Sequence, residues 1–190
     1  MKPWYDWLLD ALAGLRTESK LQDLSSGPLS AATSITGSFD LPTFSQSRQE
    51  ADDQIRATMV AFMRASLGDA YVYAAEIDDA DADPKAGDCS EYMEAMHHRG
   101  GLSYPDGCVS QKAFMRAREV ARPRPGDVFF LGPNARGIPH TGMYEGDSLC
   151  IHALGGKGVV RWSIAEVEGH PRFEGWWRHP DLSWPEQDRV

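Results

Sequence analysis

The stretch "AGDCSEYMEAM" (residues 86–96) combines a helix start with a cysteine at the first helical position. Asp88 is a favoured N-cap residue, and Glu91, three positions later, completes the pattern of a capping box. After the cap, buried-type side chains recur at helical spacing, at Cys89, Tyr92, Met93 and Met96. The sequence therefore predicts a helix that begins at Cys89 and buries one face.

The position of Cys89 has two interpretations. In the first turn of a helix, unpaired backbone N–H groups and the helix dipole favour the thiolate, which is the nucleophilic form of cysteine. Cysteine is also among the most often buried residue types, and the face that Cys89 shares with Met93 and Met96 suits a core. This stretch alone favours the core, because a nucleophile also needs a base within hydrogen-bond reach.

The segments around this stretch predict helices first and strands later. Residues 47–68 have apolar side chains at helical spacing, with Ser47 and Glu50 as a capping box and Gly68 at the end. After residue 121 the period changes to two, in short segments at residues 127–131, 140–145, 148–154, 158–164 and 173–179. This order predicts an α+β fold in which N-terminal helices pack on an antiparallel β-sheet.

Two of the six histidines fall in neighbouring predicted strands and are the candidate bases, His140 and His152. A two-residue turn at Gly146-Asp147 would place these two histidines on opposite faces of the hairpin. A three-residue connection over residues 145–147 would place His140 directly opposite His152. The sequence leaves this register open, and only the second alternative builds a Cys–His–His relay. The other four are interpreted as surface residues: His97, His98, His170 and His179.

Composition and charge exclude several functions. The chain has 190 residues and a net charge of −9, which argues against binding nucleic acid through phosphate contacts. No apolar run approaches the roughly 20 residues that span a bilayer. The aspartates at 79, 81 and 83 lack the glycine and closing glutamate of a calcium loop, so we expect no metal. Two cysteines receive no role: Cys150 is predicted in the core and Cys108 at the surface.

The N-terminal part differs from the rest. Residues 1–45 are predicted to form a short amphipathic helix followed by an extended arm rich in Ser, Thr, Gly and Pro, and residues 46–190 the main domain. The first residues carry acidic side chains and no small-residue cleavage pattern, so we expect no signal peptide and synthesis in the cytoplasm. The exposed stripe of Trp and Leu on the first helix predicts either a partner surface or packing on its own domain.

Five segments in order resemble the NlpC-type papain-like cell-wall peptidases, and the resemblance covers about residues 51–178. They are "LGDAYVYAAE" (67–76), "GDCSEYMEAM" (87–96), "YPDGCVSQ" (104–111), "RPGDVFF" (124–130) and "HTGMYEGDSLCIHA" (140–153). The resemblance implies a papain-like NlpC-type fold with Cys89 as nucleophile, His140 as general base and acid, and His152 as the group that orients His140. It also implies that three residues line the substrate cleft: Tyr71, Asp88 and Ser90.

The implied reaction is hydrolysis of peptidoglycan stem peptides through a thioester, at the bond between D-glutamate and a diamino acid, without metal or organic cofactor. Asp88 and Ser90 would meet the free amino end of the stem peptide. The long acidic loop before Cys89 is similar to peptidase domains of phage lysins and tail proteins. We therefore expect a phage-associated, tail-borne wall hydrolase, with the arm of residues 1–45 as a tether to other tail proteins.

Two departures from the family pattern keep alternatives open. Glu91 stands where the family has glycine, and Ala74-Ala75 stands where it has Gly-Gly. A carboxylate near the thiol opposes formation of the thiolate. The alternatives are an endolysin released at lysis, and a structural tail or adaptor protein that keeps the fold without the activity.

Overall fold

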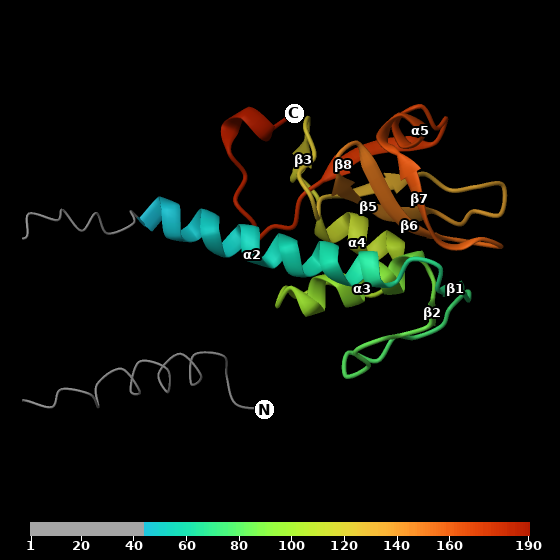
Figure 1. The fold of residues 1–190 in the computed structure, drawn as a ribbon. Helices are drawn as coiled ribbons and strands as arrows, with labels where there is room; N and C mark the ends of the chain where they lie inside the picture. Colours follow the sequence, from blue (N-terminus) through green and yellow to red (C-terminus); the bar gives the residue numbers. More distant parts are fainter. Residues whose placement is uncertain (1–43) are drawn as a thin grey trace, which may run out of the picture. The chain divides into compact units, whose positions relative to one another are not determined.

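The described part of the chain begins with a long helix and continues into a sheet-rich half (Figure 1). The computed structural model describes residues 44–190, so the predicted helix and arm within residues 1–43 lie outside the described residues. The elements are α2 (Phe44–Ala65), β1 (Ala70–Tyr71), β2 (Ala86–Gly87), α3 (Cys89–Arg99), α4 (Cys108–Phe114), β3 (Glu119–Val120), β4 (Val128–Leu131), β5 (His140–Gly146), β6 (Leu149–Leu154), β7 (Gly158–Ser163), α5 (Ile164–Glu168), β8 (Phe173–Trp177) and the 3-10 helix η1 (Glu186–Asp188).

The main sheet has six strands in the order β3-β8-β4-β5-β6-β7, and all neighbours are antiparallel. The five strands predicted from the period-two segments are β4 to β8. A separate parallel pair joins β1 to β2. Figure 1 shows α2, α3 and α4 on one side of the sheet and α5 on the other. The predicted α+β architecture, with N-terminal helices packed on an antiparallel sheet, is confirmed.

Strand β4 is buried on both faces, because each face of the sheet has its own core. Val128 and Phe130 belong to the core that α2 and α3 complete with several methionines. Phe129 and Leu131 belong to a second core, on the face that α5 covers with Val167. Four consecutive apolar residues therefore form a central strand, as is typical when both faces are covered.

Helix α2 begins one turn earlier than predicted. It starts at Phe44, so Ser47 lies inside the helix and the predicted capping box of Ser47 and Glu50 is wrong. No proline or glycine in residues 44–46 stops the helix there. Gly68 follows the helix with a φ of 91°, a left-handed conformation that glycine adopts without strain. Within residues 44–190, no helix combines the length and the apolarity needed to cross a membrane.

All three cysteines are free and buried. The prediction that Cys150 lies in the core is confirmed, because its side chain is fully buried in the second core. The prediction that Cys108 is exposed is wrong. Cys108 begins α4, and this helix turns the thiol inward to the core shared with α3.

His97 and His179 are buried, contrary to their predicted place at the surface. The chain after β8 covers the end of α3, where Nε2 of His179 lies 2.8 Å from the carbonyl oxygen of Ser103. The ring of His97 stacks on Tyr104 with 3.8 Å between centroids, and its Nδ1 donates to the carbonyl oxygen of Met93 at 2.7 Å. Burial lowers the pKa of His97 to about 3.

This buried histidine predicts a loss of stability in mild acid. Its pKa in the folded protein lies below the value of 6.5 expected when unfolded, so the unfolded chain takes up the proton first. The contribution is complete above pH 6.5 and falls as the pH drops toward 3. Between pH 7 and pH 5 we expect His97 to reduce the free energy of unfolding by about 2 kcal/mol. Urea unfolding of wild type and His97→Phe at both pH values measures the difference.

The neighbouring His98 provides the control. Burial is the largest single influence and opposes its charge, but the hydrogen bond and charge of Asp79, the carbonyl oxygen of Tyr104 and the charge of Glu94 together raise the pKa of His98. A histidine with a raised pKa stabilises the fold below pH 6.5. The fall in the free energy of unfolding between pH 7 and pH 5 should therefore be larger in His98→Gln than in wild type, and smaller in His97→Phe. Equal slopes for wild type and His97→Phe would contradict the prediction.

Candidate active site

Cys89 is the first residue of α3, as the sequence predicts. The N-cap is confirmed: Oδ1 of Asp88 accepts hydrogen bonds from the backbone N–H groups of Ser90 at 2.9 Å and of Glu91 at 3.1 Å. Oδ2 of Asp88 accepts the N–H of Ala74 at 3.2 Å, so the cap also holds the chain that follows β1. These bonds fix the backbone on both sides of the thiol.

Glu91 does not complete the predicted capping box. Its Oε2 accepts the N–H of Ile77 at 3.0 Å, and the side chain is buried. The carboxylate therefore joins α3 to the loop between β1 and β2. It does not accept the backbone N–H of Asp88, the hydrogen bond that a capping box requires. A sequence-local rule fails here because a tertiary contact competes for the same oxygen.

Burial controls the ionisation of the thiol. It raises the pKa of Cys89 to about 11, and the backbone N–H of Thr141, which hydrogen-bonds to the sulfur, lowers the pKa only in part. The thiolate predicted from the helix start is therefore not the resting form. Since Cys89 is 6 % exposed, a nucleophilic role requires a base that removes the proton during attack.

The hairpin of β5 and β6 follows neither of the two predicted registers. Its two-residue turn is at Asp147-Ser148, both with positive φ (50° and 62°), as in a type I′ turn. Next to the turn Gly146 pairs with Leu149, but further along Tyr144 pairs with Cys150. The shift makes Glu145 an extra residue, a β-bulge.

The bulge places both histidines on one face. Continuing the pairing of Tyr144 with Cys150 puts Gly142 opposite His152, and His140 lies two residues further along the same face. A side chain on Gly142 would not fit, because a Cβ there would lie 2.6 Å from Cβ of His152 and 2.6 Å from a ring carbon of Phe129. Because Gly142 has no side chain, the imidazoles of His140 and His152 can contact each other across the two strands.

The two imidazoles are in hydrogen-bond contact. Nε2 of His140 lies 2.7 Å from Nδ1 of His152. Burial lowers the pKa of His140 to about 3, with the neighbouring His152 adding to the effect, and burial lowers the pKa of His152 to about 4. Both rings are neutral at pH 7. If Nε2 of His140 donates to His152, Nδ1 of His140 is the nitrogen that can accept a proton.

Trp162 covers the relay. The two tryptophans of β8, Trp176 and Trp177, are buried. Trp162 is only half-buried: its ring packs against His152 with 4.3 Å between centroids and also lines a cavity. Nε2 of His152 is buried under it without a hydrogen-bond partner among the described residues.

Two cavities meet at Cys89. The larger, of about 790 Å³, is lined by both Cys89 and His140, so the structure places the predicted nucleophile and base at one cleft. The smaller, of about 300 Å³, is lined by Cys89 and by the three residues predicted to contact substrate: Tyr71, Asp88 and Ser90. Tyr71 lines both cavities, and burial raises the pKa of its phenol to about 12. Five of the six site residues named from the sequence thus line one or both of these cavities, and the sixth, His152, lies behind His140 and contacts it.

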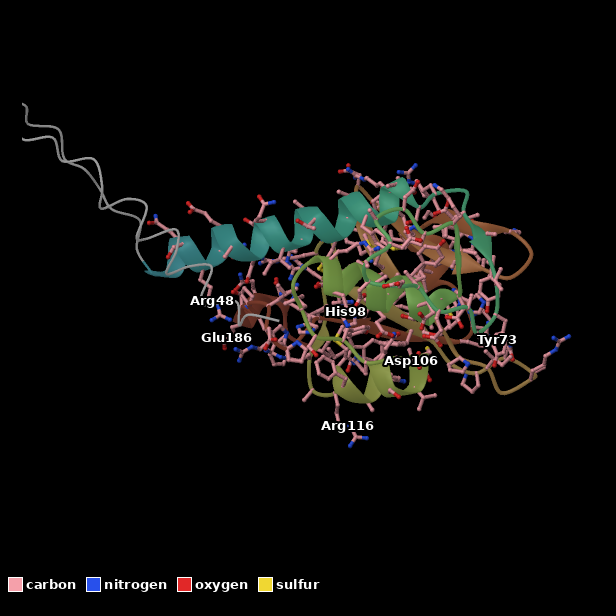
Figure 2. The ribbon with its side chains drawn as sticks, turned by 90° about the horizontal axis from the view of Figure 1, so that it is seen from below. Arg48, Tyr73, His98, Asp106, Arg116 and Glu186 are labelled. Carbon is pink, nitrogen blue, oxygen red and sulfur yellow. The ribbon has the colours of Figure 1, made fainter. Side chains whose placement is uncertain are left out.

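Apart from Glu91, which the sequence indicates near the thiol, several residues of the cleft were not found from the sequence. Glu76, Glu91 and Asp106 line the smaller cavity, and Arg136 and Arg172 line the larger. Figure 2 shows Tyr73 and Asp106 on the same side of the molecule. These residues come from separate loops and elements, so no spacing in the sequence links them.

The three carboxylates could in principle hold a cation, since one oxygen of each lies within 4.8 Å of the others. Burial raises the pKa of Glu91 to about 7, and its hydrogen bond with Asp106 acts in the same direction. A ligand carboxylate must be deprotonated to bind a metal. A partly protonated Glu91 is a poor metal ligand near neutral pH, so this group does not carry a metal assignment.

Solved structures with the same fold are numerous, at low sequence identity. RipB, a peptidoglycan hydrolase of Mycobacterium tuberculosis, matches with a TM-score of 0.57 and 17% identity over 95% of this chain and 81% of that chain. The P60 domain of an antigen from M. avium subspecies paratuberculosis matches with a TM-score of 0.55 and 20% identity, over 70% and 98% of the two chains. These likenesses support the fold.

Other comparisons set the limits of the likeness. NlpC2 and NlpC1 of Trichomonas vaginalis match with 20% identity and TM-scores of 0.52 and 0.53, and the present chain spans less than half of each, 47% and 44%. No curated protein matches the sequence. The sequence model of the NlpC/P60 family matches residues 68–178, which include both histidines and the cysteine of the cleft. The chain therefore belongs to the NlpC/P60 family.

Proposed function

We propose that the protein is a cysteine peptidase that hydrolyses peptidoglycan stem peptides, with Cys89 as nucleophile, His140 as general base and acid, and His152 as the residue that orients His140. The observation that carries the proposal is the cleft in which Cys89 and His140 line one cavity while His140 contacts His152 at 2.7 Å. RipB and SagA, two matched structures of the same fold, are named peptidoglycan hydrolases.

The neutral resting site sets the order of the chemical steps. Sγ of Cys89 attacks the carbonyl carbon while its proton moves to Nδ1 of His140. The C–N bond then breaks, and the leaving amine takes that proton, which leaves a thioester on Cys89. Water attacks the thioester with His140 again accepting a proton; the C–S bond breaks and the thiol recovers its proton.

His152 acts through His140. A hydrogen bond that His140 donates from Nε2 to Nδ1 of His152 keeps the accepting nitrogen of His140 unprotonated and stabilises the imidazolium that forms after proton transfer. Trp162 packs on His152 and restricts its ring. This arrangement compensates for the lowered pKa of His140, because the positive charge arises only beside the developing negative charge of the intermediate.

The smaller cavity suits the acyl part of the substrate. Its lining contains carboxylates and no Lys or Arg, which favours a cationic group such as the free amino end of a stem peptide. Asp88, Ser90 and Tyr71 are the proposed contacts there. The scissile bond would then be that between D-glutamate and the diamino acid, without metal or organic cofactor.

For the biological setting we propose a phage-associated enzyme carried on the tail, with residues 1–45 as the tether to other tail proteins and 46–190 as the peptidase domain. The support is the likeness of the acidic loop before Cys89 to phage lysins and tail proteins. Detection of the protein in intact virions would fit this setting, whereas detection only in lysates would favour an endolysin released at lysis.

The test of the activity is digestion of purified diaminopimelate-type cell wall by the wild-type protein, with released fragments identified by mass spectrometry. We expect fragments with a new amino-terminal diamino acid and a matching free carboxylate on D-glutamate. Cleavage at another bond would correct the assignment of the acyl cavity. Complete absence of fragments would favour a structural tail or adaptor protein, the alternative that Glu91 and the raised thiol pKa support.

A further inference from the structure

The two halves of the cleft carry opposite charge. The cavity on the side of Asp88 is lined by four carboxylates and no basic residue: Glu76, Asp88, Glu91 and Asp106. The larger cavity, on the side of His140, is lined by Arg136 and Arg172 and by no acidic residue. Both halves include Cys89, so the change of sign occurs at the thiol. A substrate with ends of opposite charge would bind in one direction only.

One N–H group of the Arg172 guanidinium anchors the side chain, and its other N–H groups can bind a ligand. Its Nη1 donates to the carbonyl oxygen of Gly132 at 2.6 Å, which anchors the half-buried side chain at the wall of the cavity. Within residues 44–190 neither Arg172 nor Arg136 has an ion-pair partner, whereas the buried Arg178 binds two carboxylates. A guanidinium has five N–H donors and matches a carboxylate in a bidentate geometry. An anchored arginine with an open fork is therefore suited to bind an anion.

The reaction decides which part of the substrate lies beside these arginines. His140 must deliver its proton to the leaving amine, and His140 lines the larger cavity and not the smaller one. The leaving residue therefore lies on the arginine side, and the acyl part on the carboxylate side. A carboxylate on the leaving residue would meet Arg172 and Arg136.

We propose that Arg172, assisted by Arg136, binds a carboxylate of the residue on the leaving side of the scissile bond. The cleft thereby selects stem peptides whose diamino acid carries a free side-chain carboxylate, over peptides in which that group is amidated or in which lysine replaces the diamino acid. This inference rests on the proposed peptidase activity and adds to it the recognition of the leaving residue.

The experiment compares three synthetic stem peptides that differ only at the third residue: diaminopimelate, side-chain-amidated diaminopimelate and lysine. For wild type we expect kcat/KM to be about tenfold higher or more for the free carboxylate, since a hydrogen bond to a charged group is worth about one to two factors of ten. Arg172→Gln should remove most of that preference by lowering only the value for the free carboxylate. Arg172→Lys, which keeps the charge and loses the bidentate fork, should lie between the two.

The matched control is Arg116→Gln, an exposed residue in the turn after α4 and away from Tyr73 (Figure 2), which should keep the wild-type preference. Calorimetric titration of Cys89→Ala and of the double variant with Arg172→Gln, using the same peptides, should show the same preference in binding. Equal kcat/KM of wild type for free and amidated peptides overturns the inference, as does an equal fall for both in Arg172→Gln. If wild type cleaves none of the peptides nor the cell wall, the proposed function itself fails, which is a different result from cleavage without preference.

Discussion

Replacing Cys89 with alanine is expected to lower the rate of wall hydrolysis by roughly 10³-fold or more, to background. The proposed thioester forms on this sulfur, and no other side chain can replace it. Of the three cysteines, Cys89 alone lines the cavity that His140 lines. Cys108 lines the smaller cavity of the cleft but not the larger one, and Cys150 lies in the core beneath α5. Release of soluble fragments from purified sacculi is the measurement.

The variant must also keep its fold for the result to have meaning. The substitution removes one buried sulfur, and the cap of α3 depends on Asp88 rather than on Cys89, so we expect the melting temperature to stay within a few degrees of wild type. Cys150→Ala is the matched control, because it removes another buried thiol, one that lines neither cavity of the cleft, and should keep the activity. More than a tenth of wild-type activity in Cys89→Ala would contradict the role of the thiol.

Replacing Asp127 with alanine is expected to reduce the free energy of unfolding by about 3–5 kcal/mol. Asp127 is fully buried and accepts hydrogen bonds from Arg56 at 3.0 Å and from Arg178 at 2.7 Å. It also accepts the backbone N–H of Arg124 at 2.8 Å. The substitution leaves Arg178, which is 0 % exposed, with only the Asp188 carboxylate as counter-charge. This loss is a large share of a typical stability of about 5–15 kcal/mol.

Urea denaturation measures this loss, with Lys112→Gln as the control. Lys112 and Glu174 form an ion pair at 2.6 Å, but both side chains are about 40 % exposed, so its removal should cost at most about 1 kcal/mol. Asp127→Asn should lie between the two variants, because the amide retains the shape and one acceptor but loses the charge. A change of less than 1 kcal/mol in Asp127→Ala would show that the buried arginines find other partners.

The helix start at Cys89 could be predicted because the forces that build it are local. Asp88 caps N–H groups two and three residues away, and no distant residue is needed to form those bonds. Both predicted capping boxes were wrong, for different reasons. Glu91 accepts a hydrogen bond from the N–H of Ile77 instead of from Asp88, and α2 begins at Phe44, before Ser47. The surface assignment of His97 failed because the C-terminal segment covers the end of α3.

The geometry of the site depends on contacts that a linear pattern does not contain. The bulge at Glu145 brings His140 and His152 to one face, and Glu145 is itself held by Arg64 and Arg161 from other elements, each at 2.6 Å. The arginine and carboxylate sides of the cleft come from loops that meet only after folding.

The sequence by itself determined the start of α3 at Cys89, the presence of the long helix before it, the period-two strands and the antiparallel α+β arrangement, because capping and side-chain periodicity act over a few neighbouring residues. Only the tertiary structure decided the register of the hairpin, the neutral resting state of the thiol and imidazoles, and the opposite charge of the two cavities. Each of these depends on burial and on contacts between segments distant in the chain, since desolvation and electrostatic interaction are set by proximity in space.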